Sequence, residues 1–540
     1  MGVTRAAGDG LDVGVAAVVT HAPASRALHL AVFLFAILFV SSFDGMWSGK
    51  RYAYAADSAS YIEMADSLYQ QGHPRVTPWD YAEGSADQIP QRLFPPGYPL
   101  LVAAFIPVTG SARTAALLPG RLAAILMPVV LLALFAGALN ARVLALLSMY
   151  VLLTPGVRGW QYLAYSDVSA LLVSVLALGA LARGLGLLAS TRRPLLWCCL
   201  AGLAAGCAYG IRNAGIAVLA ITAVMLMESL WRRWAWREAL AVSAGIVPPL
   251  GALLLYNLRT FGQLQPYAMP PSQRAWFLNV VDWARASFTD AGVPWQVAEP
   301  LPHWIAPCVL AVALLVIATG FWKLHGDPRR RALLLLLGGY AAGGALLLIA
   351  SRSRYEWGNT IDERNTLQYT WALAFALTLS VPIVFGAQWV ARFGRAALAF
   401  MLLMFGMSVY DAWVVGTAPT EWWQELAADT QVINAARAPN IGFQASNQAV
   451  LFRIGAGQPV RNVEIGGDDR DLWRALSELR QHAAGRSAQF LLVCDQYTSG
   501  YSACGGEGVT GVPAPLCQLV REPSPRVVVC PVSADKNLTP

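Results

Sequence analysis

The sequence predicts a mainly α-helical, polytopic membrane protein with about eleven transmembrane helices, followed by a small C-terminal α/β domain. Of the 540 residues, 56% are hydrophobic and only 13% are charged, whereas a soluble domain carries roughly 25% charged residues. Apolar runs near the roughly 20 residues that cross a bilayer recur along the chain, and short clusters of basic residues separate them. Together these observations exclude an ordinary soluble enzyme.

The first apolar run, 27–46, is predicted to be the first transmembrane helix. It is long for a signal sequence, and no A-x-A cleavage site follows it. Residues 1–26 are then a cytoplasmic tail, and the transmembrane domain extends over 27–416. The later apolar runs lie at 116–139, 143–155, 168–189, 195–211, 214–230, 238–256, 303–322, 332–350, 366–390 and 396–416.

The basic residues predict how this domain is oriented. With the N-terminus in the cytoplasm, the cytoplasmic loops collect nearly every tight basic cluster, as the positive-inside rule requires. These clusters comprise Arg142, Arg183, Arg192, Arg193, Arg232, Arg233, Arg237, Lys323, Arg329, Arg330, Arg331, Arg392 and Arg395. The loops 47–98, with amphipathic helices, and 257–302 then face outward. We therefore predict a multi-pass protein of the cell inner (plasma) membrane whose C-terminal domain is extracytoplasmic.

The net charge of +7 does not indicate nucleic acid as a partner. The basic residues follow the pattern of membrane topology, and the sequence contains no long basic tract, zinc-ligand spacing or RNA-binding motif.

Residues 417–540 differ in composition from the rest of the chain and are predicted to form the α/β domain. Strand and helix patterns alternate over 440–455, 458–465, 468–485 and 488–495, and 526–532 is a further candidate strand. Four cysteines lie in this domain, so an oxidising compartment would leave three disulfide pairings open: Cys494, Cys504, Cys517 and Cys530. The other four lie in apolar runs and are predicted to be buried: Cys198, Cys199, Cys207 and Cys308.

An acidic stretch, YAADSASYIEMADSLYQQGH, follows the first span and is predicted to form an amphipathic helix just outside the membrane. Asp57 and Tyr61 share one face of this helix with Met64 or Ala65. Asp57 is either an N-cap or a catalytic carboxylate. Ser60 and Glu63 offer a competing capping box, which leaves Asp57 available for chemistry.

Two further outer features accompany this helix. The block FPPGYP, 94–99, contains three prolines and is predicted to be a rigid turn that excludes a regular helix across the hexapeptide. Asp167 opens an apolar run from the outer side, where it either complements the helix dipole or acts in a functional site.

Four arginines at the predicted outer surface depart from the positive-inside trend: Arg212, Arg352, Arg354 and Arg364. Guanidinium groups bind phosphate through paired hydrogen bonds, so a phosphate or diphosphate is one expected partner. The alternative is pairing with the nearby acids Glu356, Asp362 and Glu363.

The order of these features resembles the GT-C superfamily of polyprenyl-phosphate-sugar-dependent glycosyltransferases, the branch of protein mannosyltransferases and the lipid A aminoarabinose transferase. The segments that carry the resemblance are an outer-loop Asp-x-x-x-Tyr, RLFPPGYPLLVA, PGRLAAIL, the Ser-Asp before the fourth span, GLAAGCAYGIRNAGI and YNLRTFG. It covers roughly 27–416 and implies that Asp57 is the base and that Asp167 is the second acid. Many relatives carry paired acids where this chain has Asp57-Ser58.

The resemblance and the residues together predict an inverting glycosyltransferase of the cell envelope. It would move a hexose or pentose from a polyprenyl-phosphate donor to an extracytoplasmic lipid, glycan or protein, with the bilayer holding the donor's tail. Arg212 and Arg364, or Arg352 and Arg354, would bind the donor phosphate, and Tyr61 and Tyr98 would position substrate. No cofactor or metal ligand set is assigned, and a divalent cation, held for example by Asp167, is left open. The alternatives are a lipid or solute transporter or flippase, and a non-catalytic scaffold.

Overall fold

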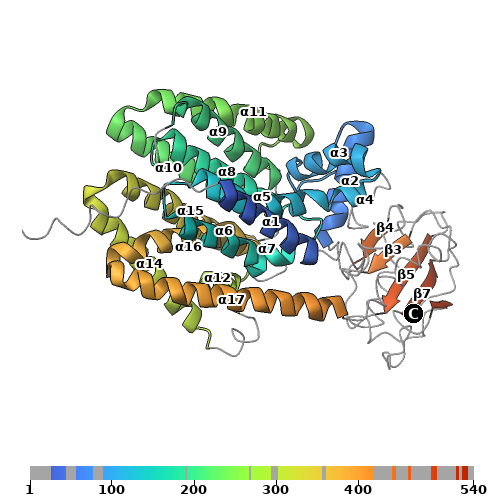
Figure 1. The fold of residues 1–540 in the computed structure, drawn as a ribbon. Helices are drawn as coiled ribbons and strands as arrows, with labels where there is room; N and C mark the ends of the chain where they lie inside the picture. The colour runs from blue at the N-terminus through green and yellow to red at the C-terminus, as the bar shows by residue number, and fades with distance from the viewer. Residues whose placement is uncertain are drawn as a thin grey trace, which may run out of the picture.

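The computed structural model describes residues 26–43, 56–76, 89–188, 191–266, 269, 271–293, 302–355 and 361–417, together with five strands in the C-terminal segment. Figure 1 shows a bundle of long helices running in alternating directions. Every apolar run predicted to be a span contains a helix: α1 (Arg26–Phe43), α5 (Leu118–Leu134), α6 (Ala141–Leu153), α8 (Asp167–Gly184), α9 (Pro194–Ile211), α10 (Ile216–Arg233), α11 (Trp236–Phe261), α14 (Ile305–Lys323), α15 (Pro328–Arg354), α16 (Glu363–Phe385) and α17 (Ala387–Thr417).

Eight helical segments in the described residues are long and apolar enough to cross a membrane. Five of them are the single helices α8, α9, α11, α15 and α16. The other three join two elements each: α4 (Ala112–Ala115) with α5, the 3-10 turn η3 (Asn213–Gly215) with α10, and α14 with the 3-10 turn η4 (Leu324–Gly326). The apolar helices at Arg26–Ser41, Ala141–Leu153 and Gly394–Met407 are shorter. The polytopic helical architecture is therefore confirmed, and the count of about eleven spans stays a prediction.

Shorter elements gather at one end of the bundle. They are α2 (Ala56–Gln71), the hairpin of β1 (Arg75–Val76) and β2 (Ile89–Pro90), α3 (Gly97–Thr109), α4 (Ala112–Ala115), α7 (Pro155–Trp160) and α12 (Trp276–Asp290). The helix α3 begins at Gly97, inside the FPPGYP block, so no helix extends across the whole hexapeptide, as expected, and its last three residues form the first turn of α3. Proline is tolerated in the first turn of a helix, where no intrahelical partner for its missing N–H is needed, and Pro99 occupies that turn.

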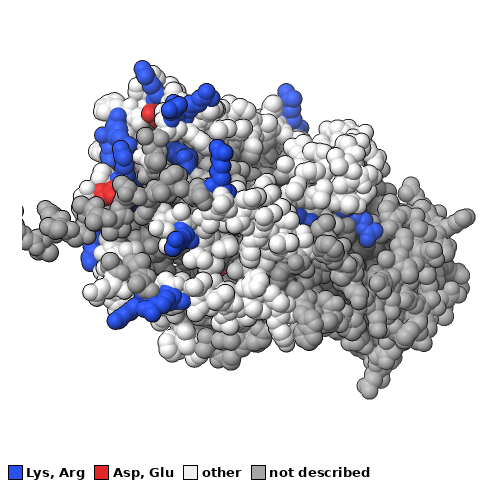
Figure 2. All heavy atoms as spheres, in the orientation of Figure 1, with Lys and Arg blue, Asp and Glu red and all other residues white. Residues whose placement is uncertain are grey.

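The predicted cytoplasmic basic residues lie together at the opposite end. Arg183 donates to the carbonyl of Leu134 at 2.9 Å, and Lys323 donates to the carbonyl of Val384 at 3.2 Å. These bonds place the C-terminal ends of α5, α8, α14 and α16 at one end of the bundle. Figure 2 shows basic side chains gathered toward the left of the view. The helices therefore alternate in direction as the charge pattern predicts.

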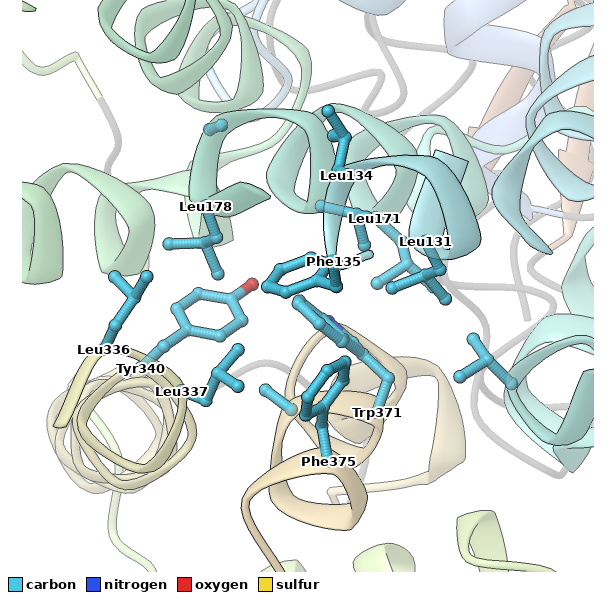
Figure 3. Close-up of a cluster of buried hydrophobic side chains, with 14 of the residues drawn as sticks. Leu131, Leu134, Phe135, Leu171, Leu178, Leu336, Leu337, Tyr340, Trp371 and Phe375 are labelled. Carbon is cyan, nitrogen blue, oxygen red and sulfur yellow. The ribbon is translucent and has the colours of Figure 1, made fainter. Parts of the chain in front are cut away.

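An aromatic core holds the middle of the bundle together. The centre of the Phe135 ring lies 5.0 Å from the centre of the Phe375 ring and 6.1 Å from that of Trp371. Tyr340 adds a ring 6.2 Å from Trp371. Figure 3 shows these side chains meeting between α5, α15 and α16, with leucines of α8 closing the cluster. This packing fixes the helices whose outer ends carry the candidate site.

The C-terminal segment contains a five-stranded sheet in the order β4-β3-β5-β7-β6. The strands are β3 (Ile441–Gln444), β4 (Val460–Val463), β5 (Ala488–Cys494), β6 (Gln518–Arg521) and β7 (Arg526–Val532). The first three pair in parallel, whereas β7 is antiparallel to both β5 and β6. Four of the strands lie in segments that the sequence predicts as strands. The predicted helix at 468–485 lies outside the described residues, and the α/β domain over 417–540 stays a prediction.

Candidate active site

The ends of four helices bring two carboxylates and two guanidinium groups together. Asp57 lies in the first turn of α2 and Asp167 opens α8. Arg212 follows the last residue of α9, and Arg364 lies in the first turn of α16. All four come from residues that the sequence predicts to share the outer surface.

The position of Asp57 is set by the buried face of α2. Tyr61, Met64 and Ala65 are all buried, which confirms the predicted helical face. The ring of Tyr61 lies 4.8 Å from that of Tyr98, and its hydroxyl lies 3.0 Å from the Ser166 hydroxyl. The helix begins at Ala56, so the expected capping box at Ser60 and Glu63 is wrong; Ser60 is a buried residue of the second turn.

Asp167 is a fully buried charge with two cationic partners. Its carboxylate accepts from Arg212 at 2.7 Å and from the Nε of Arg364 at 3.1 and 3.2 Å. Its backbone carbonyl also accepts a 2.7 Å bond from the Gln368 side chain. A buried carboxylate is tolerated when it is paired and hydrogen-bonded. Asp167 therefore ties α9 and α16 to the start of α8.

Arg212 is held by the contact between the two most specific sequence motifs. It is an extended residue, with φ −151° and ψ 136°, between α9 and η3. A side chain at Gly97 of FPPGYP would place its Cβ 2.4 Å from the carbonyl oxygen of Gly210 in GIRNAG, so only glycine allows this approach. The side chain of Asn213 also donates to the Leu93 carbonyl at 3.2 Å. The two motifs therefore form one structural unit that positions Arg212.

Arg364 lies at the centre of the group. Asp362 caps α16 by accepting from the backbone N–H of Asn365, which fixes the turn that carries the arginine. The guanidinium carbon lies 4.2 Å from the ring centre of Tyr165 and 5.4 Å from that of Trp160, a geometry that is attractive for a cation. The Nε atom of Arg364 contacts the carboxylate of Asp167, and its Nη2 atom contacts that of Asp57.

The two carboxylates differ in their access to solvent. The side chain of Asp57 is 23% exposed, whereas that of Asp167 is fully buried. The side chains of Arg212 and Arg364 retain 17% and 19% exposure. The side chains of Asp57, Arg212 and Arg364 are therefore partly open to solvent, whereas that of Asp167 is closed to it.

The two site tyrosines are not alternative bases. Burial raises the pKa of Tyr61 well above its usual value, and the nearby Asp57 carboxylate raises it further. Burial and Asp57 have the same effect on the pKa of Tyr165. Both phenols therefore stay neutral near neutral pH and act as hydrogen-bonding and packing groups.

The remaining predicted site residues lie elsewhere or act indirectly. Tyr98 is fully buried, donates to the Ala116 carbonyl at 2.7 Å and packs against the ring of Tyr61. The role of Tyr61 and Tyr98 in positioning substrate stays a prediction. Arg352 is buried near the end of α15. Arg354 is exposed and lies over the ring of Tyr355 at 5.5 Å. Of the four predicted arginines, Arg212 and Arg364 are the two whose described ion pairs join them to Asp57 and Asp167.

The expected alternative partners of the arginines are only partly described. Glu356 lies outside the described residues. The ion pairs described for Arg212 and Arg364 are with Asp57 and Asp167, rather than with Asp362 or Glu363.

Sequence reasoning missed the walls of the site. Two aromatic rings, those of Trp160 and Tyr165, lie against the guanidinium of Arg364. The hydroxyl of Ser166 accepts from Arg212, and the side chain of Gln368 donates to the backbone carbonyl of Asp167. The aromatic run GWQYLAYSD before α8 was the available signal for the first three. No pattern marks Gln368, because one glutamine on an apolar helix has no characteristic spacing.

The arrangement does not fit a divalent cation between the two acids. Arg364 contacts both carboxylates and its positive charge lies where a shared metal ion would lie. No group of three or more histidine, cysteine, aspartate or glutamate side chains suited to a metal ion occurs in the part of the chain that the structure describes.

Comparisons with known proteins identify the fold. No sequence-family model matches the chain, and no curated protein matches it in sequence. ArnT from Cupriavidus metallidurans bound to undecaprenyl phosphate is similar, with a TM-score of 0.55 and 15% identity over 94% of this chain and 98% of that one. AglB from Archaeoglobus fulgidus, an archaeal oligosaccharyltransferase in complex with an inhibitory peptide and a dolichol-phosphate, has a TM-score of 0.51 and 12% identity over 86% and 69%.

The arabinofuranosyltransferase AftD from Mycobacteria has a TM-score of 0.53 and 14% identity over 95% of this chain but only 40% of its own length. All three proteins are GT-C glycosyltransferases. This chain therefore has the fold of the GT-C glycosyltransferases, the superfamily that its sequence motifs resemble.

Proposed function

We propose that this protein is an inverting glycosyltransferase that moves a sugar from a polyprenyl-phosphate donor to an acceptor outside the cytoplasm. The observation that carries the proposal is the exposed carboxylate of Asp57 beside two partly exposed guanidinium groups. A base and an anion site within one group of side chains suit the transfer of a sugar from a phosphate leaving group.

Asp57 is the proposed general base. It takes the proton of the acceptor hydroxyl, a role suited to a positioned carboxylate. The acceptor oxygen then attacks the anomeric carbon from the side opposite the phosphate. A new bond forms between the acceptor oxygen and that carbon as the bond to the phosphate oxygen breaks, and the configuration inverts.

Arg212 and Arg364 are the proposed phosphate ligands. The leaving polyprenyl phosphate is an anion that needs no proton, so its departure requires positive charge that is already in place. Asp167 is proposed to hold the two guanidinium groups in position, because both bind its buried carboxylate.

The solved relatives support the donor class. One ArnT structure contains undecaprenyl phosphate and one AglB structure contains a dolichol-phosphate. We carry this chemistry to the present chain as a polyprenyl-linked sugar whose tail stays in the bilayer. The acceptor belongs to the cell envelope and is a lipid, a glycan or a protein.

The proposed orientation follows from the two ends of the bundle. The basic residues at one end would face the cytoplasm and the acid–arginine group at the other end would face outward, in the inner membrane. The C-terminal strands would share the outer compartment. Transporters usually bind substrate near the bilayer midplane, whereas this group lies at helix ends, which favours a transferase over a transporter or flippase.

The proposal is tested in proteoliposomes that contain the purified protein and a panel of undecaprenyl-phosphate-linked hexoses and pentoses. An extract of envelope lipids and glycans supplies the acceptor. Release of undecaprenyl phosphate that depends on both donor and extract is expected, and a chelator should leave it unchanged because Arg364 occupies the space between the acids. Movement of the intact donor across the bilayer, with no release, would establish a flippase instead.

A further inference from the structure

Asp290, a residue outside the acid–arginine group, joins two helices that border it. It is the last residue of α12 and is fully buried. Its Oδ1 accepts a 2.8 Å hydrogen bond from the backbone N–H of Gly156, in the first turn of α7. On the same helix, the Ala286 carbonyl accepts from the Thr366 hydroxyl of α16 at 3.3 Å. The end of α12 is therefore fixed to both α7 and α16.

The junction leaves no space at Gly156. A Cβ atom there would lie 2.4 Å from Oδ1 of Asp290 and 2.7 Å from Cβ of Leu367 on α16. Both distances are shorter than real Cβ contacts allow. The first turn of α7 is therefore pressed against α12 and α16 at one point, and only glycine permits it.

Both helices at this junction lead directly to Arg364. The helix α7 is one and a half turns long and ends at Trp160, whose ring faces the guanidinium of Arg364. The helix α16 carries Arg364 about one turn before Leu367. Any movement of α7 relative to α16 changes the separation of Trp160 from the guanidinium.

We propose that Asp290 is a positioning residue that fixes α7 to α16 and so holds the guanidinium of Arg364 in the orientation that binds the donor phosphate. This inference rests on the proposed function, because it assigns Arg364 to that phosphate. Asp290 itself touches neither substrate nor reacting atoms.

The carboxyl group of Asp290 is unfavourable to bury at this junction, although its oxygen is needed to accept the bond from Gly156. Burial raises the pKa of Asp290 to about 7, and the polar groups of Thr370 and Gly156 offset only part of that effect. The charged groups that act on it are the carboxylates of Asp362 and Glu363, and the phenol of Tyr150 is held nearby by its bond to the Ala291 carbonyl. A costly buried group beside a functional site is characteristic of residues retained for function.

The first test compares two identical substitutions on α7. Gly156→Ala introduces the clash with Asp290, whereas Gly159→Ala has nothing within 4 Å of the new Cβ. Binding of undecaprenyl phosphate and of undecaprenol is measured for each protein in nanodiscs. Gly156→Ala is expected to weaken binding of the phosphate roughly tenfold or more and to leave the undecaprenol unaffected, and Gly159→Ala should match the parent. Equal phosphate binding by the two variants overturns the proposal.

The second test acts on the carboxyl group and stands even where Gly156→Ala does not fold. Asp290→Asn keeps an oxygen for the Gly156 N–H and is expected to bind the phosphate within roughly twofold of the parent, whereas Asp290→Ala is expected to lose roughly tenfold. Asp282→Asn is the control, because Asp282 lies on the same helix and pairs with Arg274. In a background of Arg364→Gln, Asp290→Ala should cause no further loss. An equal, additive loss in both backgrounds overturns the proposal.

The two levels of the argument fail separately. A parent protein that binds undecaprenyl phosphate no better than undecaprenol refutes the proposed donor site. If the parent prefers undecaprenyl phosphate to undecaprenol, and the variants at Asp290 and Gly156 keep the same preference, then only the role of Asp290 is refuted.

Discussion

The guanidinium of Arg364 contacts the carboxylate of Asp57, although 307 positions separate the two residues in the chain. Asp57 alone is an exposed acid at the start of a helix, and Arg364 alone is a cation at the start of another. Their contact creates a site in which a base and an anion ligand are neighbours. The same guanidinium also holds Asp167, so one side chain organises both acids.

Asp57→Asn should abolish sugar transfer and leave the fold intact. Loss of a general base lowers the rate by roughly 10²- to 10⁴-fold, while an amide of the same shape can remain beside Arg364. The measurement is the initial rate of undecaprenyl phosphate release. Asp66→Asn is the matched control, since Asp66 lies on the same helix and accepts from Gln70. Full activity of Asp57→Asn would remove this residue from the mechanism.

Asp167→Asn should destabilise the protein more than Asp57→Asn does. Removing one partner of a buried ion pair costs roughly 3–5 kcal/mol, because Arg212 and Arg364 would lose their shared buried carboxylate. Asp57 is partly exposed, so solvent compensates for its loss. Thermal unfolding in detergent, followed by size-exclusion chromatography, distinguishes the two. Equal unfolding temperatures would contradict the structural role of Asp167.

Gly97→Ala should displace Arg212 and lower both stability and phosphate binding. The new Cβ would lie 2.4 Å from the Gly210 carbonyl oxygen, which forces α3 away from α9. The reciprocal change, Gly210→Ala, places its Cβ where no atom lies within 4 Å and should be tolerated. Binding of undecaprenyl phosphate and unfolding temperature are the two measurements. A tolerated Gly97→Ala would show that the two motifs need not touch.

Asp290→Asn should stabilise the protein above about pH 7 and not below about pH 4. The pKa of Asp290 is raised from 3.8 to about 7 in the folded state, so the folded protein retains the proton more tightly than the unfolded chain. Stability is therefore lost as the pH rises between these values. The full difference of about three units corresponds to about 4 kcal/mol, which the neutral asparagine avoids. Unfolding measured from pH 4 to pH 8 should show the gap between variant and parent widening and then levelling.

The sheet register excludes one of the three cysteine pairings. On β5 and β7, Phe490 lies opposite Cys530 and Cys494 lies opposite Arg526. Cys494 and Cys530 are thus four positions out of register, roughly 13 Å along the strands, beyond the roughly 7 Å reach between the Cα atoms of a disulfide. Peptide mapping without reduction should find no link between Cys494 and Cys530 in protein exported to an oxidising compartment.

Hydropathy and charge predicted the helices and the end at which each outer residue lies. Consecutive helices run in opposite directions, so the end of one helix and the start of the next lie at the same end of the bundle. This places four residues at one end: Asp57, Asp167, Arg212 and Arg364. Tyr61 was expected on the correct face of its helix because the 3.6-residue period fixes which side chains are buried.

The contacts within the site could not be predicted in the same way. Whether Arg364 or Arg354 reaches Asp57 depends on how α15 and α16 pack, and four arginines on one surface are equivalent in sequence. Asp290 lies in the segment 257–302, where the sequence shows no motif; its importance arises from α7 and α16 closing around it. Trp160 and Tyr165 become site walls only when α16 inserts Arg364 between them and the acids.

The separation of Asp57 from Arg364 also determines when the site can form during synthesis. The ribosome releases the first outer loop long before α16 enters the membrane. Asp57 and Asp167 are therefore synthesised well before Arg364, the cation that contacts both of them. The site is completed only after nearly every span is inserted. A chain that stops before α16 would lack the guanidinium that contacts both Asp57 and Asp167, and Arg212 would then be the described ion-pair partner left to Asp167.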